Sequence, residues 1–479
     1  MYINGLFSEG QVLVMNTVSK YQIDMCHGPL FSKIVLFSLP LMASNIMQVL
    51  FNAVDMIVIG HYAPHEAMAA VGSCGPLIMM ILNIFFGLSV GANVLTARYI
   101  GARDRTEVFQ TVHTAMATAL YGGILLAAFG IMISRPVLEM MQTPAEVLPK
   151  ASLYMWLYCA GIPFILLYNF GSSILRAGGD TRRPLIYMLI SGGVKVGLNF
   201  FLVSTCHWDV AGVAVSTLIS SLLSSALVIM ALSELRDGSR LFLKKIRLYG
   251  SNFKEILKIG VPAGIQGSLF SFSNVIIQST INSFGSKAMA GNAATGSLEG
   301  IVYVAFNAYY FSVISFVGQN HGAHKYKRIV KSMFYCQLLA VLTAFVFGWI
   351  IFIFGPQLLR IYNPDPGVIQ WGMIRLKYLV TTYFLCALMD TISGSLRGLG
   401  HSLTPMIVTM LGACFFRIAW VFWVFPHFRT MENLLLSYPV SWFLVFLVNG
   451  TILYFVCRKL FDNVAHQPHH IGYGTIRIR

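Results

Sequence analysis

A stripe of polar side chains interrupts the apolar stretch between residues 34 and 60. Asn45, Gln48, Asn52 and Asp55 follow one another at steps of three, four and three positions, which places them on one face of a helix. A carboxylate at the centre of a bilayer costs at least about 2.5 kcal/mol, so such an acid usually faces a partner or a cavity. The stripe predicts an ion-coupling site at Asp55, with Gln48 and Asn52 lining a substrate cavity. Hydrogen bonding between helices is the alternative for the amides.

Asn199 lies one helical turn after the base Lys195 in the apolar stretch 184–204. The two side chains are expected to form a polar cluster with Asp55, so Asn199 is predicted to join the ion site. The alternative for Lys195 is that its long side chain reaches toward the membrane interface.

Two further acids fall inside apolar stretches of the second half of the chain. Glu299 lies in GSLEGIVYV, and Asp390 lies in CALMDTISGSLRG. Acids at this depth are usually functional, so both are predicted to take part in ion coupling. A structural ion pair with a buried base such as Arg417 is the alternative.

A neutral polar stripe crosses the stretch 256–282, where one face repeats every four positions. Its members are Gln266, Phe270, Asn274, Gln278 and Asn282. Gln266, Asn274 and Gln278 are predicted to line the substrate cavity, and contacts between helices are again the alternative.

The composition is that of a polytopic membrane protein. Of the 479 residues, 56% are hydrophobic and 11% are charged, and the mean hydropathy is +0.70; soluble domains carry about 25% charged residues. The net charge of +15 is spread over short loops, which argues against a nucleic-acid partner. No Gly-Lys pair occurs, so the G-x-x-x-x-G-K-[ST] nucleotide site is absent, and no cofactor, metal site or catalytic residue is predicted.

Twelve apolar stretches are long enough to cross a bilayer, so an all-α membrane protein with twelve transmembrane helices is predicted. The expected spans are 34–60, 67–97, 110–134, 151–175, 184–204, 209–233, 256–282, 288–318, 332–354, 371–396, 405–425 and 433–457.

Basic residues are distributed unequally between the two sides of these spans. The termini and alternate loops hold 24 Lys and Arg, whereas the opposite loops hold 5. The excess predicts that both termini lie in the cytoplasm. The first thirty residues lack the pattern of a cleaved signal, so we expect the first span to direct insertion.

The chain repeats itself. ILRAGGDTRRP at 174–184 resembles SLRGLGHSLTP at 395–405 with an offset of 221, which also pairs Gly101 with Gly322 and Asn169 with Asp390; Pro40 and Pro262 differ by 222. Two homologous six-helix bundles are therefore expected, related by a pseudo-two-fold axis along the membrane normal, with a substrate site between them that includes Asn169. The predicted division is 1–30 (cytoplasmic segment), 31–240 (first bundle), 241–255 (cytoplasmic connector), 256–460 (second bundle) and 461–479 (cytoplasmic tail).

Four motifs resemble the multidrug and toxic compound extrusion (MATE) family of secondary transporters, and the resemblance covers residues 28–460. They are the spacing of Pro40, Ser44, Asn52 and Asp55, then VGANVLTARYIGARD, LRAGGDTRRP and LRGLGHSLTP. The resemblance implies proton- or sodium-coupled antiport of bulky, often cationic or aromatic compounds through alternating access of the two bundles.

The resemblance also implies roles for single residues. Asp55 and Asn199 match the family's ion-coupling aspartate and asparagine, Asp390 matches an aspartate of the second half, and Glu299 resembles an acid of some members. Val203 stands where some members have a second aspartate, and the glutamate that several branches carry near Gln266 is missing. Proton coupling at Asp55 is therefore favoured over a dense sodium cage.

Other functions remain as alternatives. A lipid or lipid-linked oligosaccharide flippase of the same exporter superfamily would have a more cationic cavity. A membrane enzyme would need a cluster of His, Asp or Ser near one interface, and a channel would never concentrate its substrate. The expected partners are small-molecule drugs or toxins and the lipid bilayer. We expect a monomer, in the bacterial cytoplasmic (inner) membrane.

Overall fold

The computed structural model describes residues 21–141, 143–235 and 238–465, and every regular element in these ranges is helical. Eleven of the described helical segments are long and apolar enough to cross a membrane. The remaining long helix, α8, has 33 residues and carries the polar stripe, which makes it less apolar. The all-α, twelve-span architecture is therefore confirmed.

The first half of the chain forms six spans. Asp104 caps α4 by accepting from the backbone N–H groups of Thr106 and Glu107. The helices are α2 (Leu30–Tyr62), α3 (His65–Ala102), α4 (Arg105–Met140), α5 (Leu148–Ala177), α6 (Arg182–Asn199) continued by the π-helical η1 (Phe200–Thr205), and α7 (Asp209–Glu234).

The second half repeats the pattern and adds a short helix, α11, that the hydropathy does not predict. A single helical turn, η2 (Leu243–Lys245), lies in the connector between the two halves. The helices are α8 (Gly250–Asn282), α9 (Ser286–Gly322), α10 (Tyr326–Ile353), α11 (Gly355–Tyr362), α12 (Pro366–Leu379) continued by η3 (Val380–Thr382) and α13 (Tyr383–Gly398), α14 (Leu403–Thr409) continued by η4 (Met410–Phe415), α15 (Phe416–Ala419) and η5 (Trp420–Val424), and α16 (Met431–Ala465).

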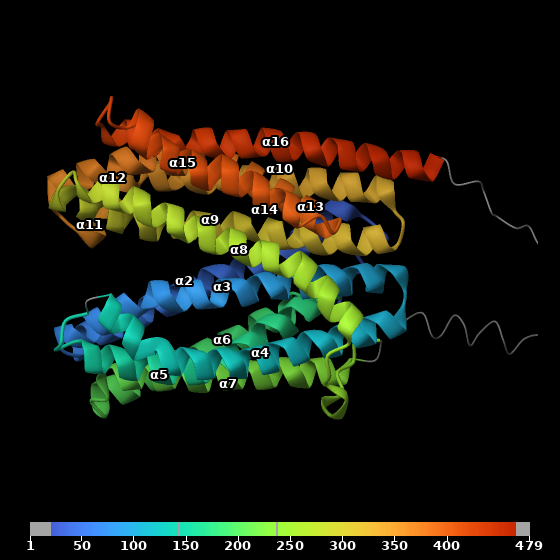
Figure 1. The fold of residues 1–479 in the computed structure, drawn as a ribbon, viewed down its shortest axis with the longest axis horizontal. Coiled ribbons are helices and arrows are strands. Elements are labelled where there is room, and N and C mark those ends of the chain that lie inside the picture. The colour runs from blue at the N-terminus through green and yellow to red at the C-terminus, as the bar shows by residue number, and fades with distance from the viewer. Residues whose placement is uncertain (1–20, 142, 236–237, 466–479) are drawn as a thin grey trace, which may run out of the picture.

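The spans form two layers, which we call the N-lobe (α2–α7) and the C-lobe (α8–α16). Figure 1 shows the N-lobe below and the C-lobe above, with α8 running diagonally from the lower layer to the upper one. Each lobe has its own hydrophobic core. We call the right-hand end in Figure 1, where α3, α5, α9 and α16 end, the basic end, because the loops rich in Lys and Arg meet there.

The first helix of each half crosses to the other lobe at the basic end. Ile34 and Phe37 of α2 pack in one cluster with Phe316 of α9. In return, Ile256 of α8 belongs to the N-lobe core, and Asn252 donates to Glu107 of α4 at 3.0 Å. The two lobes are therefore interlocked at this end.

Small residues make the crossings close. Gly87 and Gly91 of α3 face Gly264 and Gly260 of α8, and both pairs are spaced by four residues, as in the G-x-x-x-G motif of membrane helices. A Cβ at Gly264 would lie 2.6 Å from the Cα of Ile84, so a larger residue would push the helices apart.

The related crossing of α2 and α9 uses serines instead. Ser38 and Ser312, at the positions that the repeat relates to Gly260 and Gly91, share a hydrogen bond of 2.8 Å. The pseudo-symmetry thus extends to individual contacts, although glycines pack together at the crossing of α3 and α8 and serines share a hydrogen bond at the crossing of α2 and α9.

Candidate functional site

The N-lobe places Asp55 of α2 against two side chains of α6. The Lys195 ammonium Nζ lies 2.5 Å from Asp55 Oδ2, and Asn199 Nδ2 donates to Asp55 Oδ1 at 2.6 Å. Ser216 of α7 donates in turn to Asn199 Oδ1. The predicted cluster of Asp55, Lys195 and Asn199 is thus brought together as one network across three helices.

This network lies largely inside the protein. The side chains of Asp55 and Lys195 are 13% and 11% exposed, so Lys195 does not reach toward an interface and acts as the counter-ion of the carboxylate. Asn199 is fully buried at the junction of α6 with η1. π-Helical turns are often found at functional sites because they redirect side chains.

The other amides of the α2 stripe lie apart from this network. Asn45 crosses to the C-lobe and donates to the backbone carbonyl of Val304 at 3.1 Å, as expected for a contact between helices. Gln48 and Asn52 are exposed on α2, about two turns and one turn before Asp55, respectively. Their predicted role in a substrate cavity stays a prediction.

The C-lobe contains a second charged network, in which Glu299 of α9 accepts both arms of the Arg375 guanidinium from α12. The two contacts measure 2.6 and 2.8 Å. The same guanidinium donates to Asn292 Oδ1, and the Tyr383 hydroxyl donates to Glu299 Oε2 at 3.4 Å. Glu299 is therefore paired with Arg375, which was not among the predicted site residues, and not with Arg417.

The amide stripe of α8 extends this network. Gln278 Oε1 accepts from Asn292 Nδ2 at 2.6 Å, and its own Nε2 donates to Asn282 at 2.8 Å. A chain of hydrogen bonds thus runs from the α8 stripe through Asn292 to Arg375.

A cavity of about 520 Å³ opens beside this network between α8, α9, α13 and α16. Asn274, Gln278, Glu299 and Asp390 line it, together with Asn83 of the N-lobe. The volume is within the range of drug-binding cavities. Tyr303 of α9 lines the same cavity as Asp390.

Two predicted cavity residues lie elsewhere. Gln266 is buried and its Oε1 accepts from Arg397 Nη2 at 2.6 Å, so its polar group serves an internal contact. Asn169 donates to the carbonyl of Ile165 in its own helix at 2.9 Å. Neither is among the residues that line the 520 Å³ cavity, although Asn274 and Gln278 of the same α8 stripe are, so the predicted cavity role of Gln266 and Asn169 stays a prediction.

The cavity also contains residues that the sequence analysis did not select. Arg375, Tyr303 and Tyr383 are among them. Arg375 carried a usable signal, since an arginine inside an apolar span needs a partner. The tyrosines carried none, because aromatic residues are common throughout the spans.

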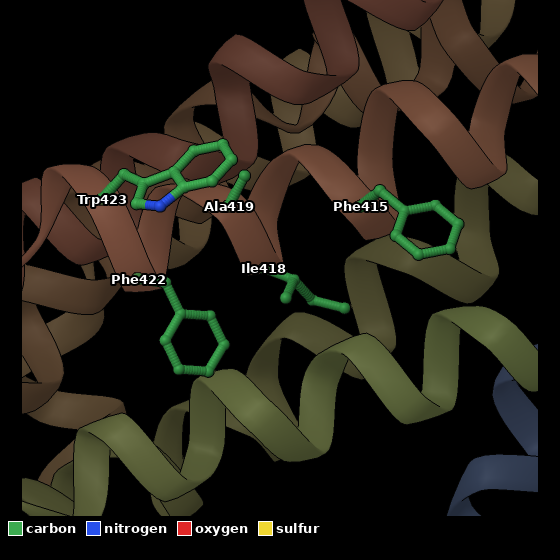
Figure 2. Close-up of a pocket in the computed structure, with 5 residues that line it drawn as sticks. All are labelled: Phe415, Ile418, Ala419, Phe422 and Trp423. Atoms are coloured by element: carbon green, nitrogen blue, oxygen red, sulfur yellow. The ribbon is translucent and has the colours of Figure 1, made fainter.

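A separate apolar groove lies along the outside of α15 and η5. It measures about 650 Å³ and is lined by Phe415, Ile418, Ala419, Phe422 and Trp423. Figure 2 shows the side chains of Phe415, Ile418 and Phe422 pointing toward the neighbouring helix drawn in green. Apart from the indole nitrogen of Trp423, the lining side chains are apolar, so the groove has the character of a membrane-facing surface.

No group of three or more His, Cys, Asp and Glu side chains in the described ranges is placed to hold a metal ion. The charged side chains of both networks instead form ion pairs, Asp55 with Lys195 and Glu299 with Arg375.

A family model described as MatE matches residues 40–201 and 262–423, so it matches the chain twice, in matches that begin at Pro40 and Pro262. The probable multidrug resistance protein NorM of Thermotoga maritima is 25% identical over 401 residues, which cover 83% of this chain and 86% of that protein. The probable multidrug resistance protein YpnP of Bacillus subtilis is 25% identical over 398 residues, covering 81% and 87%.

Solved structures share the fold. A crystal structure of MATE in complex with MaL6 superposes with a TM-score of 0.85 at 22% identity, covering 91% of this chain and 98% of that one. The two matches of the family model, the duplicated helices and this superposition lead to one conclusion: the chain belongs to the MatE family of multi-pass membrane transporters.

Proposed function

We propose that this protein is a secondary active exporter that moves bulky, often cationic or aromatic compounds out of a bacterial cell in exchange for protons. The observation that carries the proposal is the buried Asp55 carboxylate, held by Lys195 and Asn199 within one lobe of a duplicated transporter. The names of the Thermotoga and Bacillus relatives support multidrug compounds as the substrate class.

The pair with Lys195 defines how an ion can act. A proton that binds Asp55 neutralises the carboxylate and leaves the ammonium, so the local charge rises from zero to plus one. A cationic substrate nearby is then repelled, which makes proton and substrate mutually exclusive. A sodium ion is less suited to this position, because two unit charges 4 Å apart repel by about 4 kcal/mol at an effective dielectric constant of about 20.

Exchange of access follows from the two-lobe design. The lobes are interlocked at the basic end, which the charge asymmetry assigns to the cytoplasm, so this arrangement suits a state open to the outside. Protonation at Asp55 would favour repacking of α2, which crosses between the lobes. One charge moving inward across about 100 mV supplies about 2.3 kcal/mol, so export needs no ATP and the protein is not an enzyme.

The test is ethidium accumulation in inverted membrane vesicles, with pH and sodium gradients imposed separately. Asp55→Asn should abolish the accumulation driven by an acid lumen while the protein still inserts normally. The matched control is Glu146→Gln, which changes an exposed acid. Unchanged accumulation in Asp55→Asn would overturn the assignment of Asp55 as the proton site. Accumulation driven by a sodium gradient alone would show that sodium, and not the proton, is the coupling ion. Asp390→Asn applies the same test to the C-lobe acid.

A further inference from the structure

Another buried base, Arg417, lines the C-lobe cavity. It lies in α15 between the π-helical segments η4 and η5, and it is 2% exposed. Its Nε donates to Ser441 Oγ at 2.9 Å, and its guanidinium lies 4.2 Å from the ring centre of Tyr438 and 5.7 Å from that of Trp442.

The Arg417 guanidinium is incompletely satisfied. Its Nη2 is buried without a hydrogen-bond partner, and no carboxylate oxygen of the described residues lies within 4 Å of it. The acids that line the same cavity do not compensate it, because Glu299 is held by Arg375 and Asp390 lies beyond ion-pair distance. A buried cation without a partner is costly, so a natural partner from the cavity is expected.

The internal repeat explains why the partner is missing. Arg417 follows Lys195 by 222 positions, the offset that also relates the two matches of the family model, and so lies one position beyond the residue that the 221 offset of the neighbouring segments pairs with Lys195. The residue 222 positions after Asp55 is Ile277, which is 1% exposed and also lines the cavity. The C-lobe therefore has a base next to the position that corresponds to Lys195, but an apolar residue where the N-lobe has Asp55.

We propose that Arg417 anchors the carboxylate of a substrate, so the exporter accepts apolar or aromatic compounds that carry a carboxylate. The inference rests on the proposed function and assigns one residue to the recognition of those substrates that carry a carboxylate. The planar guanidinium can donate two parallel hydrogen bonds to a carboxylate, and Tyr438 and Trp442 hold it in place through their ring faces. The cavity of about 520 Å³ has room for a drug-sized body around this contact.

The test measures equilibrium binding to the purified full-length protein, without any ion gradient, so it does not depend on coupling at Asp55. The probes are a fluorescent aminoxanthene dye with a free carboxylate and the methyl ester of the same dye. Wild type should bind the free acid more tightly than the ester. Arg417→Gln should weaken binding of the free acid about tenfold or more and leave binding of the ester within about twofold.

Two further variants separate binding from folding. Arg417→Lys keeps the charge without the planar fork, so it should retain an intermediate preference for the acid. Arg360→Gln changes an exposed arginine of the same lobe and should leave both affinities unchanged.

Several outcomes would overturn the proposal. One is equal binding of acid and ester by wild type, and another is equal weakening of both probes in Arg417→Gln, which would make the residue structural. A short-chain anionic phospholipid could also displace the free acid at a lower concentration than unlabelled free acid does. That result would show that Arg417 binds a lipid phosphate and not a drug carboxylate. That result would favour a flippase.

Discussion

Gly101 of α3 and Gly322 of α9 pack reciprocally at the basic end, each against the backbone of the other's helix. A Cβ on Gly101 would collide with the carbonyl oxygen of Gln319, and a Cβ on Gly322 would collide with that of Arg98. Gln319 follows Arg98 by the same 221 positions that separate the two glycines. The contact is therefore the same from either lobe, as expected where a pseudo-two-fold axis passes between two helices.

This contact should be sensitive to a single methyl group. Gly322→Ala is expected to lower the free energy of unfolding by about 1–3 kcal/mol, because the added Cβ meets backbone that cannot rotate away. Unfolding by SDS, followed by circular dichroism, measures the change. Gly72→Ala is the control, because a Cβ at Gly72 of α3 meets nothing within 4 Å. Equal stability of the two variants would show that the lobes are not tightly closed there.

Lys195 should control the ion dependence of transport. In Lys195→Gln, Asp55 keeps its hydrogen bond from Asn199 but loses the ammonium that competes with an incoming proton. Efflux should then reach half of its maximum at a proton concentration at least about tenfold lower, since a charge-assisted contact is worth about 1.5–3 kcal/mol. Vesicle assays over a range of lumenal pH measure this. Lys195→Arg should stay close to wild type, and an unchanged midpoint in Lys195→Gln would contradict the competition.

The Glu299–Arg375 pair should stabilise the C-lobe. Its side chains are 7% and 12% exposed, so Arg375→Met leaves a buried carboxylate unpaired and should cost about 3–5 kcal/mol of unfolding free energy. Adding Glu299→Gln should recover part of this loss, which SDS unfolding of the single and double variants measures.

The exposed pair of Arg135 and Glu139 provides the control for this cycle. These side chains are 64% and 52% exposed, so Arg135→Met should change stability by at most about 1 kcal/mol. Strictly additive losses from Arg375→Met and Glu299→Gln would show that the two side chains do not interact.

Arg328 should hold the segment before α2 (residues 23–28) in place at the basic end. Its guanidinium donates to the carbonyls of Met25, His27 and Gly28 at 2.9 Å each, while the N–H of Ile23 donates to Gly179 of the N-lobe. Arg328→Gln should accelerate amide hydrogen exchange at Ile23 at least about tenfold. Lys327→Gln, at an exposed position on the same helix, should not. Unaltered exchange in Arg328→Gln would show that the segment is held elsewhere.

The sequence by itself determined the membrane class, the twelve spans and the duplication. These properties are local or periodic: hydropathy marks each span, and matched Arg, Gly and Pro reveal the repeat. It also predicted that Asp55, Lys195 and Asn199 form one cluster, because a carboxylate in an apolar span needs a nearby partner.

Only the tertiary structure decided which side chains meet across helices. It paired Glu299 with Arg375, engaged the amides of Gln266 and Asn169 in hydrogen bonds within the protein, and left Arg417 without an acid. The physical reason is that hydropathy does not distinguish a helix face that packs on protein from one that faces lipid, since both are apolar. The partner of a buried charge therefore depends on how the helices cross, which is set by close contacts such as that between Gly101 and Gly322.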